Sequence, residues 1–306
     1  MKKFMLFLGL FFAFVTAGSL AAGEEAAPRI GLTKITDGVY SYIDEKNPVP
    51  ARNFGANAGI VIGRDGIVVV DTLISSKEAQ RFISDIKAVS DKPIKYVVNT
   101  HAHLDHSLGN ADFIRLGAVV ISHIYCKKNA ETAAPTILQK AKKYGLTDEM
   151  LQGTKVAEAS LTFTDKMEID LGDRKIELLY AGPSHTDGSI LVYVPDTGVL
   201  FAGDILFTNF HPNMMDADVK SWISVLDYIS TTDAVAIIPG HGPLSTKKDI
   251  QEMKQYLMTC EKIGTELSAQ GKDANYIAAE ILKAVPRRQF FEMFVAGNVS
   301  AKYLSH

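Results

Sequence analysis

The sequence of 306 residues predicts an α+β fold, a four-layer αββα sandwich with a C-terminal helical extension. The main observation is an order of elements that occurs twice: an apolar hairpin, an aspartate, an amphipathic helix, an apolar strand and a histidine. Two such halves predict two facing sheets with helices on the outside, and the ends of their strands then meet at one edge. The composition, 47% hydrophobic and 22% charged, is that of an ordinary globular domain.

The first half of the repeat begins at Ala58. The stretch AGIVIGRDGIVVVDT predicts two apolar strands joined by a Gly-Arg-Asp-Gly turn, and the second strand ends at Asp71. A helix is predicted from Ser76 to about Ser90, because apolar residues recur there at helical spacing. The apolar strand 94–98 follows and leads into the loop 99–110.

The second half repeats this order more than a hundred residues later. Its predicted elements are the strands 189–194 and 199–202, the helix 219–229 and the strand 234–238. Asp204 follows its hairpin in the sequence Gly-Asp, and His241 follows its last strand between two glycines. Both residues therefore take the places that Asp71 and the histidine loop take in the first half.

Other elements connect and extend the two halves. Between them we expect a strand at 118–122, a helix at 127–144, a loop or short helix at 145–155, and strands at 161–169 and 175–180. Helices are predicted at 247–269 and 275–285, where Pro286 ends the second. We expect one domain over residues 22–306, including a helical tail of about 246–306. The tail could cover a cleft, but an apolar helical stripe favours packing against a sheet.

The first 21 residues are typical of a signal peptide. Lys2 and Lys3 precede an apolar run from Phe4 to about Leu20, and small residues suited to cleavage follow. This pattern predicts an exported bacterial protein, periplasmic or secreted, without a stable membrane span after cleavage. An uncleaved membrane anchor is the alternative, since the run approaches the ~20 residues that a span needs, although glycine and threonine interrupt it.

The charge of the chain argues against one class of partner, and its two cysteines allow at most one disulfide. Removal of residues 1–21 leaves 30 basic and 35 acidic side chains, a net charge of −5 with no basic run, which argues against nucleic-acid binding. A small-molecule substrate is the expected partner, and the sequence does not predict an oligomeric state. Cys126 and Cys260 could form one disulfide, but two buried free thiols are the favoured interpretation.

The loop NTHAHLDHSLGN concentrates groups that bind metals. It contains His101, His103, Asp105 and His106, and imidazole and carboxylate are ligands that zinc takes. Two histidines two positions apart on a turning backbone can point the same way, which leaves Asp105 and His106 for the other side of the turn. The loop therefore indicates two neighbouring metals rather than one.

Further ligands must come from elsewhere in the chain. His185 lies in a turn of small residues between two strands, Asp204 follows a buried strand where an unpaired carboxylate would be costly, and His241 lies between two glycines. These three are candidate ligands because the repeat carries them to the edge of the histidine loop. The remaining histidines, His123, His211 and His306, lack such surroundings. His211, seven residues past Asp204, could still line the mouth of the site.

Taken together, these residues resemble the metallo-β-lactamase superfamily, in its dinuclear His-x-His-x-Asp-His form, over about residues 35–243. The resemblance implies a first metal held by three histidines, a second metal held by Asp105 with two histidines, and a bridging aspartate. The implied first set is His101, His103 and His185, the second is Asp105, His106 and His241, and Asp204 bridges. Asp71 matches the family's non-ligand aspartate, which orients the ligand loop.

The resemblance also implies metal-dependent hydrolysis. Two divalent ions, zinc by preference with iron or manganese as alternatives, would share a hydroxide that attacks an ester, thioester, lactone or amide carbonyl. Asp105 would be catalytic, because it can orient that hydroxide and take up its proton.

Several substrate classes stay open at this point. The Gly-Asp at 203–204 and the full motif resemble hydroxyacylglutathione hydrolase (glyoxalase II) and lactonases. A secreted β-lactamase is the alternative, although the commonest zinc β-lactamases have a cysteine at the place of Asp204 and a lysine at the place of Phe207. A non-catalytic metal-binding protein and an iron-dependent persulfide dioxygenase are further alternatives from other classes.

Overall fold

The structure is a computed structural model, and it describes residues 31–304. The predicted signal peptide, residues 1–21, and His306 lie outside the described residues. Within residues 31–304, no helix is long and apolar enough to cross a membrane.

The first sheet has seven strands in the order of the chain, β1 to β7. They are β1 Thr33–Thr36, β2 Val39–Ser41, β3 Gly59–Gly63, β4 Gly66–Val70, β5 Ile94–Val98, β6 Val119–His123 and β7 Leu161–Phe163. The first four are antiparallel, and β4 to β7 are parallel.

The second sheet has five strands in the order β12-β11-β10-β9-β8. They are β8 Lys166–Asp170, β9 Lys175–Leu179, β10 Leu191–Val194, β11 Val199–Phe207 and β12 Ala236–His241. Only β11 and β12 are parallel. Every residue of β11 is buried, so this long strand forms the centre of its half.

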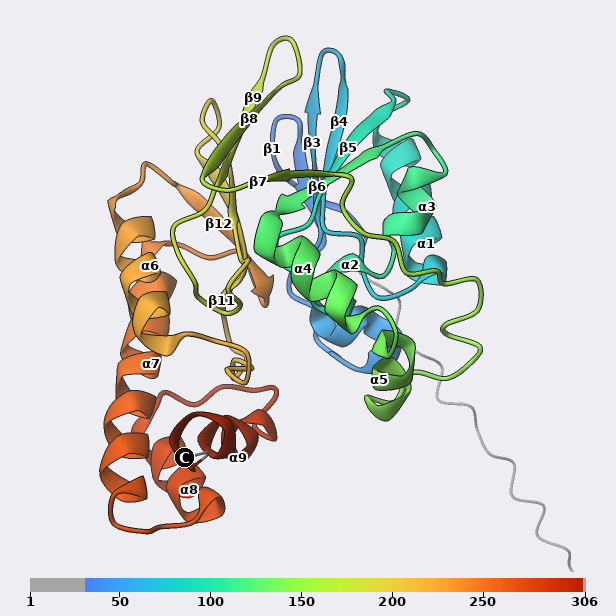
Figure 1. Cartoon of the computed structure of the whole chain (residues 1–306). Coiled ribbons are helices and arrows are strands. Elements are labelled where there is room, and N and C mark those ends of the chain that lie inside the picture. Colours follow the sequence, from blue (N-terminus) through green and yellow to red (C-terminus); the bar gives the residue numbers. More distant parts are fainter. Residues whose placement is uncertain (1–30, 305–306) are drawn as a thin grey trace, which may run out of the picture.

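The helices lie outside the two sheets and at one end of the molecule (Figure 1). They are α1 Ser76–Val89, α2 Leu104–Ser107, α3 Asn110–Ile114, α4 Ile124–Ala133, α5 Ile137–Lys143, α6 Val219–Thr231, α7 Lys247–Ser268, α8 Ala274–Ala284 and α9 Phe294–Val299. A 3₁₀ turn covers Pro50–Gly55, and a short π-helical turn, Ser300–Leu304, follows α9.

The predicted repeat is confirmed. In the first half, β3 and β4 form an antiparallel hairpin, and α1 connects β4 to the parallel strand β5. In the second half, β10 and β11 form the hairpin, and α6 connects β11 to the parallel strand β12. Because parallel neighbours end at the same edge of a sheet, the residues after β4 and β5 in one half face those in β11 and β12 in the other.

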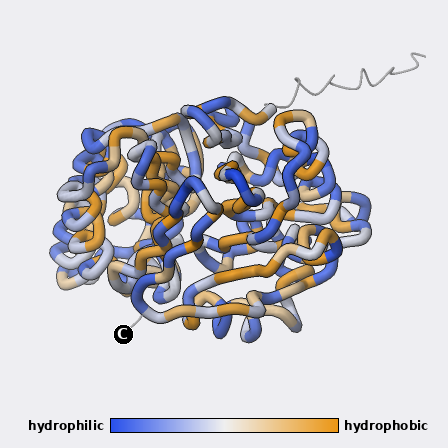
Figure 2. The backbone as a smooth tube through the Cα atoms, turned by 90° about the horizontal axis from the view of Figure 1, so that it is seen from above, coloured by the Kyte–Doolittle hydropathy of each residue, from blue (hydrophilic) through white to orange (hydrophobic). Residues whose placement is uncertain are grey.

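Three hydrophobic layers hold the sandwich together and confirm the αββα prediction. One layer lies between the sheets and includes Val68 and Val98 from the first and Leu178 and Phe201 from the second. The outer layers join α1 to the first sheet, and α6, α7 and the tail to the second. Figure 2 shows hydrophobic stretches of the backbone crossing the middle of the molecule, and hydrophilic stretches in many of its outer turns.

Some predicted bounds were wrong for identifiable reasons. The predicted strand 161–169 is two strands, β7 and β8, because the chain passes from one sheet to the other at residues 164–165. The predicted helix 127–144 is interrupted after Ala133, since Pro135 cannot donate a helical hydrogen bond. The strand predicted at 199–202 continues to Phe207, so Asp204 lies inside it rather than after it. Strands β1 and β2 and helices α2, α3 and α9 were not predicted, and α2 lies within the predicted loop 99–110.

The two cysteines are separate. Cys126 in α4 and Cys260 in α7 are both buried and free, which confirms the favoured interpretation. Burial raises the pKa of both thiols to about 12, so they are protonated apolar side chains at neutral pH.

Candidate metal centre

All seven candidate ligands meet at the edge where the two halves of the repeat face each other. Four come from the loop and short helix after β5, and the others come from the second half. The four are His101, His103, Asp105 and His106, and the others are His185 before β10, Asp204 within β11 and His241 at the end of β12. They form two groups whose donor atoms each lie within 4.8 Å of one another.

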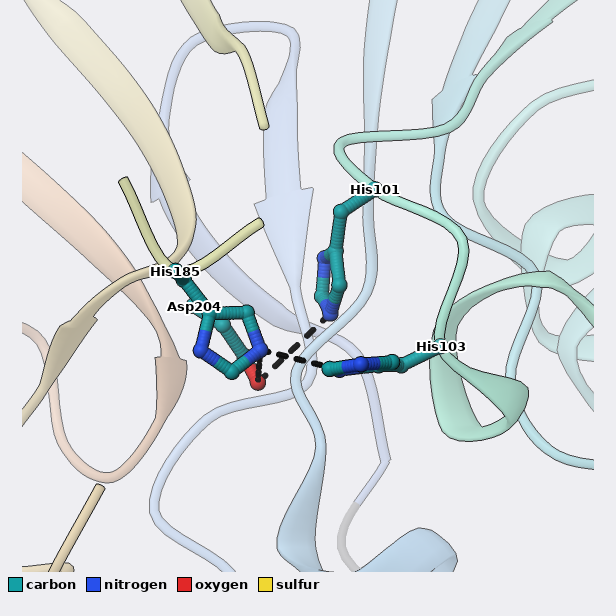
Figure 3. Close-up of side chains that lie close together, drawn as sticks. All are labelled: His101, His103, His185 and Asp204. Atoms are coloured by element: carbon teal, nitrogen blue, oxygen red, sulfur yellow. Dashed lines mark hydrogen bonds and ion pairs between the residues drawn. The ribbon is translucent and has the colours of Figure 1, made fainter. Parts of the chain in front are cut away.

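The first group consists of His101, His103, His185 and Asp204. His185 Nε2 lies 2.9 Å from His103 Nδ1 and 3.2 Å from Asp204 Oδ2, and His101 Nε2 lies 3.6 Å from the same oxygen. Figure 3 shows the four side chains pointing toward one another from two separate parts of the fold. Three imidazole nitrogens and one carboxylate oxygen therefore converge on one point.

The second group consists of Asp105, His106 and His241. His241 Nε2 lies 3.4 Å from Asp105 Oδ2, and His106 Nε2 lies 3.8 Å from that oxygen. The second oxygen of Asp204, Oδ1, lies 3.2 Å from His106 Nε2 and 3.5 Å from His241 Nε2. Asp204 thus presents one carboxylate oxygen to each group.

The buried donor atoms fit a metal better than they fit one another. His101 Nε2, His106 Nε2 and Asp204 Oδ1 are buried and have no hydrogen-bond partner among the described residues. Buried polar atoms without partners are costly, and three of them that converge on one point fit a bound cation, which accepts their lone pairs. Imidazole and carboxylate donors in this number suit divalent zinc, iron or manganese.

The residue after β4 holds the histidine loop in place. Asp71 accepts hydrogen bonds from the Thr100 backbone N–H at 2.8 Å and from Thr100 Oγ1 at 2.7 Å, and it accepts from His106 Nδ1 at 2.9 Å. Thr100 Oγ1 also lies 3.1 Å from His101 Nδ1. These contacts fix the rings of His101 and His106 so that each Nε2 points into the centre. This is the orienting role that the family resemblance implied for Asp71.

Two further contacts orient ligands from unexpected places. Asp216, in the loop before α6, accepts a hydrogen bond from His103 Nε2 at 3.1 Å, which leaves Nδ1 for the centre. The carbonyl oxygen of Phe54 accepts from His241 Nδ1 at 3.2 Å. Phe54 has a φ of 54°, a left-handed conformation rare for an aromatic residue. Sequence reasoning missed both residues, because neither stands at a recognisable spacing from the ligand it contacts.

A glycine makes room for the central carboxylate. A Cβ atom at Gly240 would lie 1.9 Å from Asp204 Oδ1 and 2.7 Å from the Asp204 backbone nitrogen. Only glycine allows β12 to pass this close to β11. The Pro-Gly-His sequence therefore delivers His241 and accommodates Asp204 at the same place.

The protonation of the metal-free centre follows from its burial and charges. Burial lowers the pKa of His101 well below its usual range and that of His185 to about 3, which favours the neutral imidazole that a metal binds. Burial would also lower the pKa of His241, but Asp204 and Asp105 raise it to about 9. Burial would raise the pKa of Asp204, but neighbouring histidines hold it well below its usual range. Metal ions would take the place of the protons on these histidines.

A largely apolar cleft leads to the centre. Its volume is about 770 Å³ including the open mouth, and four candidate ligands line it, among them Asp105 and His241. Most of the wall is apolar: Phe54, Leu104, Ile137, Phe207, Phe291 and Phe294. Lys140 is the one lysine or arginine in the lining among the described residues. The cleft therefore suits an apolar substrate with few polar groups.

Two histidines that lacked support in the sequence lie away from the centre. His211 is buried beneath the tail, where Nδ1 lies 2.9 Å from the Tyr256 hydroxyl oxygen, so the expectation that it could line the mouth was wrong. His123 donates to the Thr164 carbonyl and accepts the backbone N–H of Tyr125 at the start of α4. Both residues are structural.

Residues 51–241 match a family model described as metallo-beta-lactamase superfamily. That range holds both sheets' central strands and all seven candidate ligands. The chain therefore belongs to the metallo-β-lactamase superfamily, whose members are metal-dependent hydrolases.

Curated relatives differ in what their names say they do. The chain is 26% identical over 240 residues to the 2,4-dinitroanisole O-demethylase subunit alpha of Nocardioides sp. (strain JS1661), covering 74% of this chain and 68% of that one. It is 25% identical to the linear primary-alkylsulfatase of Pseudomonas sp. (strain ATCC 19151), covering 62% of this chain and 42% of that one. It is 24% identical to a type 2 metallo-beta-lactamase of Bacteroides fragilis, covering 74% and 84%.

Solved structures show the same fold. A metallo-beta-lactamase from Pontibacter korlensis matches with a TM-score of 0.60 and 23% identity, over 74% of this chain and 98% of its own. A double mutant of a sec-alkyl sulfatase matches with a TM-score of 0.70 and 18% identity, over 90% of this chain and 50% of its own. The match to the sulfatase covers a larger share of this chain than the match to the β-lactamase, so the fold similarity to the sulfatase extends over more of the chain.

Proposed function

We propose that the protein is an exported dinuclear metallohydrolase, with zinc as its metal, that cleaves an ester-type bond in a substrate with an apolar chain. One observation carries the proposal: Asp204 presents one oxygen to each of two ligand groups at the base of an apolar cleft. The first ion would bind to His101, His103 and His185 and the second to Asp105, His106 and His241, with Asp204 between them.

Two divalent ions bound there would lower the pKa of a coordinated water and polarise the oxygen of the scissile group. The chain supplies the rest. Asp105 lines the cleft and its side chain is 14% exposed, so it can reach the attacking water, orient it and accept its proton. Asp71 and Asp216 keep the histidine rings in place during the reaction, so that little reorganisation is needed.

The walls of the cleft favour an amphiphilic substrate. Its aromatic and aliphatic lining would bind an alkyl or aryl group, and Lys140 would attract a negative charge. Carboxylic esters, thioesters, lactones and sulfate esters with apolar chains fit this description. The relatives named alkylsulfatase and O-demethylase support a class of substrate with an organic chain joined through oxygen.

A β-lactamase is the second candidate, supported by the relative from Bacteroides fragilis. The commonest zinc β-lactamases have a lysine that anchors the carboxylate of the β-lactam. This chain has Phe207 at that place, and the Phe207 ring stacks on His241 with ring centroids 5.1 Å apart. Lys140 is therefore the cation that would bind such a carboxylate from α5.

The test is a comparison of substrates on the mature protein, whose metal content is measured first by mass spectrometry. We expect hydrolysis of p-nitrophenyl decanoate or decyl sulfate that stops on chelation and in Asp204→Ala, and that falls at least about a hundredfold in Asp105→Asn. Asp227→Asn, an exposed carboxylate change on α6, is the control. Turnover of a chromogenic cephalosporin alone would favour the second candidate, and bound metal without any turnover would favour a metal-binding protein.

Export rests on the N-terminal sequence, and its test is separate. We expect the protein from the periplasm or medium of a bacterial host to begin near residue 22, as measured by mass spectrometry of the intact chain. A full-length chain in the membrane fraction would favour the anchor.

A further inference from the structure

The C-terminal segment 286–294 reaches the cleft, although it lies beyond the part of the chain that matches the family model. Phe291 and Phe294 line the cleft, and the ring centroid of Phe291 lies 5.6 Å from that of the candidate ligand His241. The tail was expected to pack rather than cover the cleft, and it does both: α7 packs against α6 and β11, and the segment after α8 lines the cleft. Figure 1 shows α9 and α5 at the same end of the molecule.

The two phenylalanines are only partly covered by protein. Phe291 contacts Phe210 at 5.1 Å and Phe294 at 5.2 Å between ring centroids, and both Phe291 and Phe294 are half-buried. The apolar surface that they leave uncovered faces the same cleft as Ile137 and Leu104 from α5 and α2. An apolar chain that entered the cleft would remove this surface from water.

Arg288 ties the segment to the strand that carries Asp204. Its Nη1 donates to the carbonyl oxygens of Phe207 at 2.8 Å and Phe210 at 2.7 Å, and its guanidinium lies 4.6 Å from the centre of the Tyr256 ring. No carboxylate lies within ion-pair distance of Arg288 among residues 31–304. Arg288 is half-buried and has no ion-pair partner among these residues, so its hydrogen bonds to the carbonyls at and just after the end of β11 are what the fold gains from it.

Backbone contacts join the same two segments. The Gln289 N–H donates to the Asn209 carbonyl at 2.9 Å, and the His211 N–H donates to the Phe290 carbonyl at 2.9 Å. Phe291 follows with a φ of 66°, a left-handed conformation that is strained for a phenylalanine. The structure thus holds this side chain beside His241 at a cost in backbone energy.

We propose that Phe291 and Phe294 form the subsite that receives the apolar chain of the substrate, and that Arg288 is the positioning residue that seats this subsite against the metal centre. This inference rests on the proposed function, because it describes the substrate of the same centre. It assigns chain-length preference to the C-terminal segment rather than to the shared superfamily fold.

The test measures binding rather than turnover, so that it does not depend on the reaction. Titration calorimetry on the zinc-loaded mature protein compares acetate, hexanoate and decanoate as probes. We expect affinity to rise by about two- to fourfold per methylene group as the chain is buried. In Phe291→Ala, decanoate binding should weaken by about tenfold while acetate binding changes by less than about twofold.

The positioning role has its own variants. Arg288→Met should reduce the dependence on chain length as Phe291→Ala does, and Arg288→Lys, which keeps one charged donor, should restore part of it. Met293→Ala is the matched control, because Met293 lies on the same segment, is 75% exposed and does not line the cleft. Thermal unfolding establishes whether each variant is folded. If Arg288→Met does not fold, Phe291→Ala alone tests the subsite.

Equal losses for acetate and decanoate in Phe291→Ala, or no dependence on chain length in the wild type, would overturn the subsite. A normal dependence on chain length in folded Arg288→Met would overturn the positioning role. Length-dependent binding without hydrolysis of any ester would refute the proposed reaction and leave the subsite standing. Ester hydrolysis and ligand binding that are both independent of chain length would support the proposed reaction and overturn the subsite.

Discussion

Asp216 shows how a single exposed carboxylate can control a buried centre. It accepts the Nε2–H of His103, and this hydrogen bond holds the pKa of Asp216 at about 2. His103 is the most exposed histidine of the first group, with 22% of its side chain accessible, so its ring depends on this contact more than the buried rings do. The residue therefore orients the nitrogen that faces the metal.

We expect Asp216→Ala to weaken binding of the first metal by about tenfold, because the His103 ring and its tautomer are no longer held. Competition with a chromophoric chelator measures this affinity. Asp227→Ala, at an aspartate of similar exposure on the neighbouring helix, is the control. Equal metal affinity in both variants would contradict the orienting role.

His211 makes stability depend on pH at a distance from the metal. Burial, with Arg288 nearby, lowers the pKa of His211 to about 4, whereas an unfolded histidine has a pKa of about 6.5. The unfolded state therefore binds more protons between these values. Stability from this group is complete above about pH 6.5 and is lost as the pH falls toward 4.

Below pH 6.5 we expect the free energy of unfolding to fall by up to ~1.4 kcal/mol per pH unit from this residue. His211→Asn keeps an acceptor for the Tyr256 hydroxyl and removes the titration, so its stability should fall less between pH 7 and pH 5. Urea unfolding of both metal-free proteins measures the difference. Parallel pH profiles for the two proteins would disprove this account.

At the scale of elements, α6 and β11 depend on each other. Trp222 of α6 is fully buried, donates from Nε1 to the Ile205 carbonyl of β11 at 2.9 Å, and lies 5.5 Å from the ring of His185. The periodicity of α6 was predictable, since its apolar residues recur at helical spacing. The hydrogen bond was not, because it joins a side chain to a backbone oxygen on another element.

Trp222→Phe should destabilise the protein by about 1–3 kcal/mol, since it leaves the Ile205 carbonyl without its partner inside the core. Urea unfolding with an unchanged slope measures the loss. Tyr228→Phe, on the exposed side of the same helix, should change stability by less than about 0.5 kcal/mol. A comparable loss in both variants would point to the helix as a whole rather than to this contact.

For the whole molecule, the metal centre joins the two halves of the repeat. The first group combines His101 and His103 from one half with His185 and Asp204 from the other, and the second group is divided in the same way. Ions that bind only the folded centre must stabilise the whole sandwich, because unfolding either half removes ligands.

We expect chelation to lower the free energy of unfolding, and zinc at a hundred times its dissociation constant to restore ~2.7 kcal/mol for each site. Thermal and urea unfolding over a range of zinc concentrations provide the measurement. Asp204→Ala should respond much less, because it lacks the carboxylate that both groups share. A wild-type stability independent of zinc would exclude this coupling.

The sequence by itself determined the fold class, the repeat and the candidate ligands. Periodicity, turn residues and the spacing of the histidine motif are local properties, and the rule that parallel strands end at one edge joined the halves. Only the tertiary structure showed that Asp204 lies inside β11 rather than after it, that Asp216 and Phe54 orient two histidines, and that Phe291 lines the cleft. Such contacts join residues far apart in the chain at no fixed spacing, so packing alone decides them.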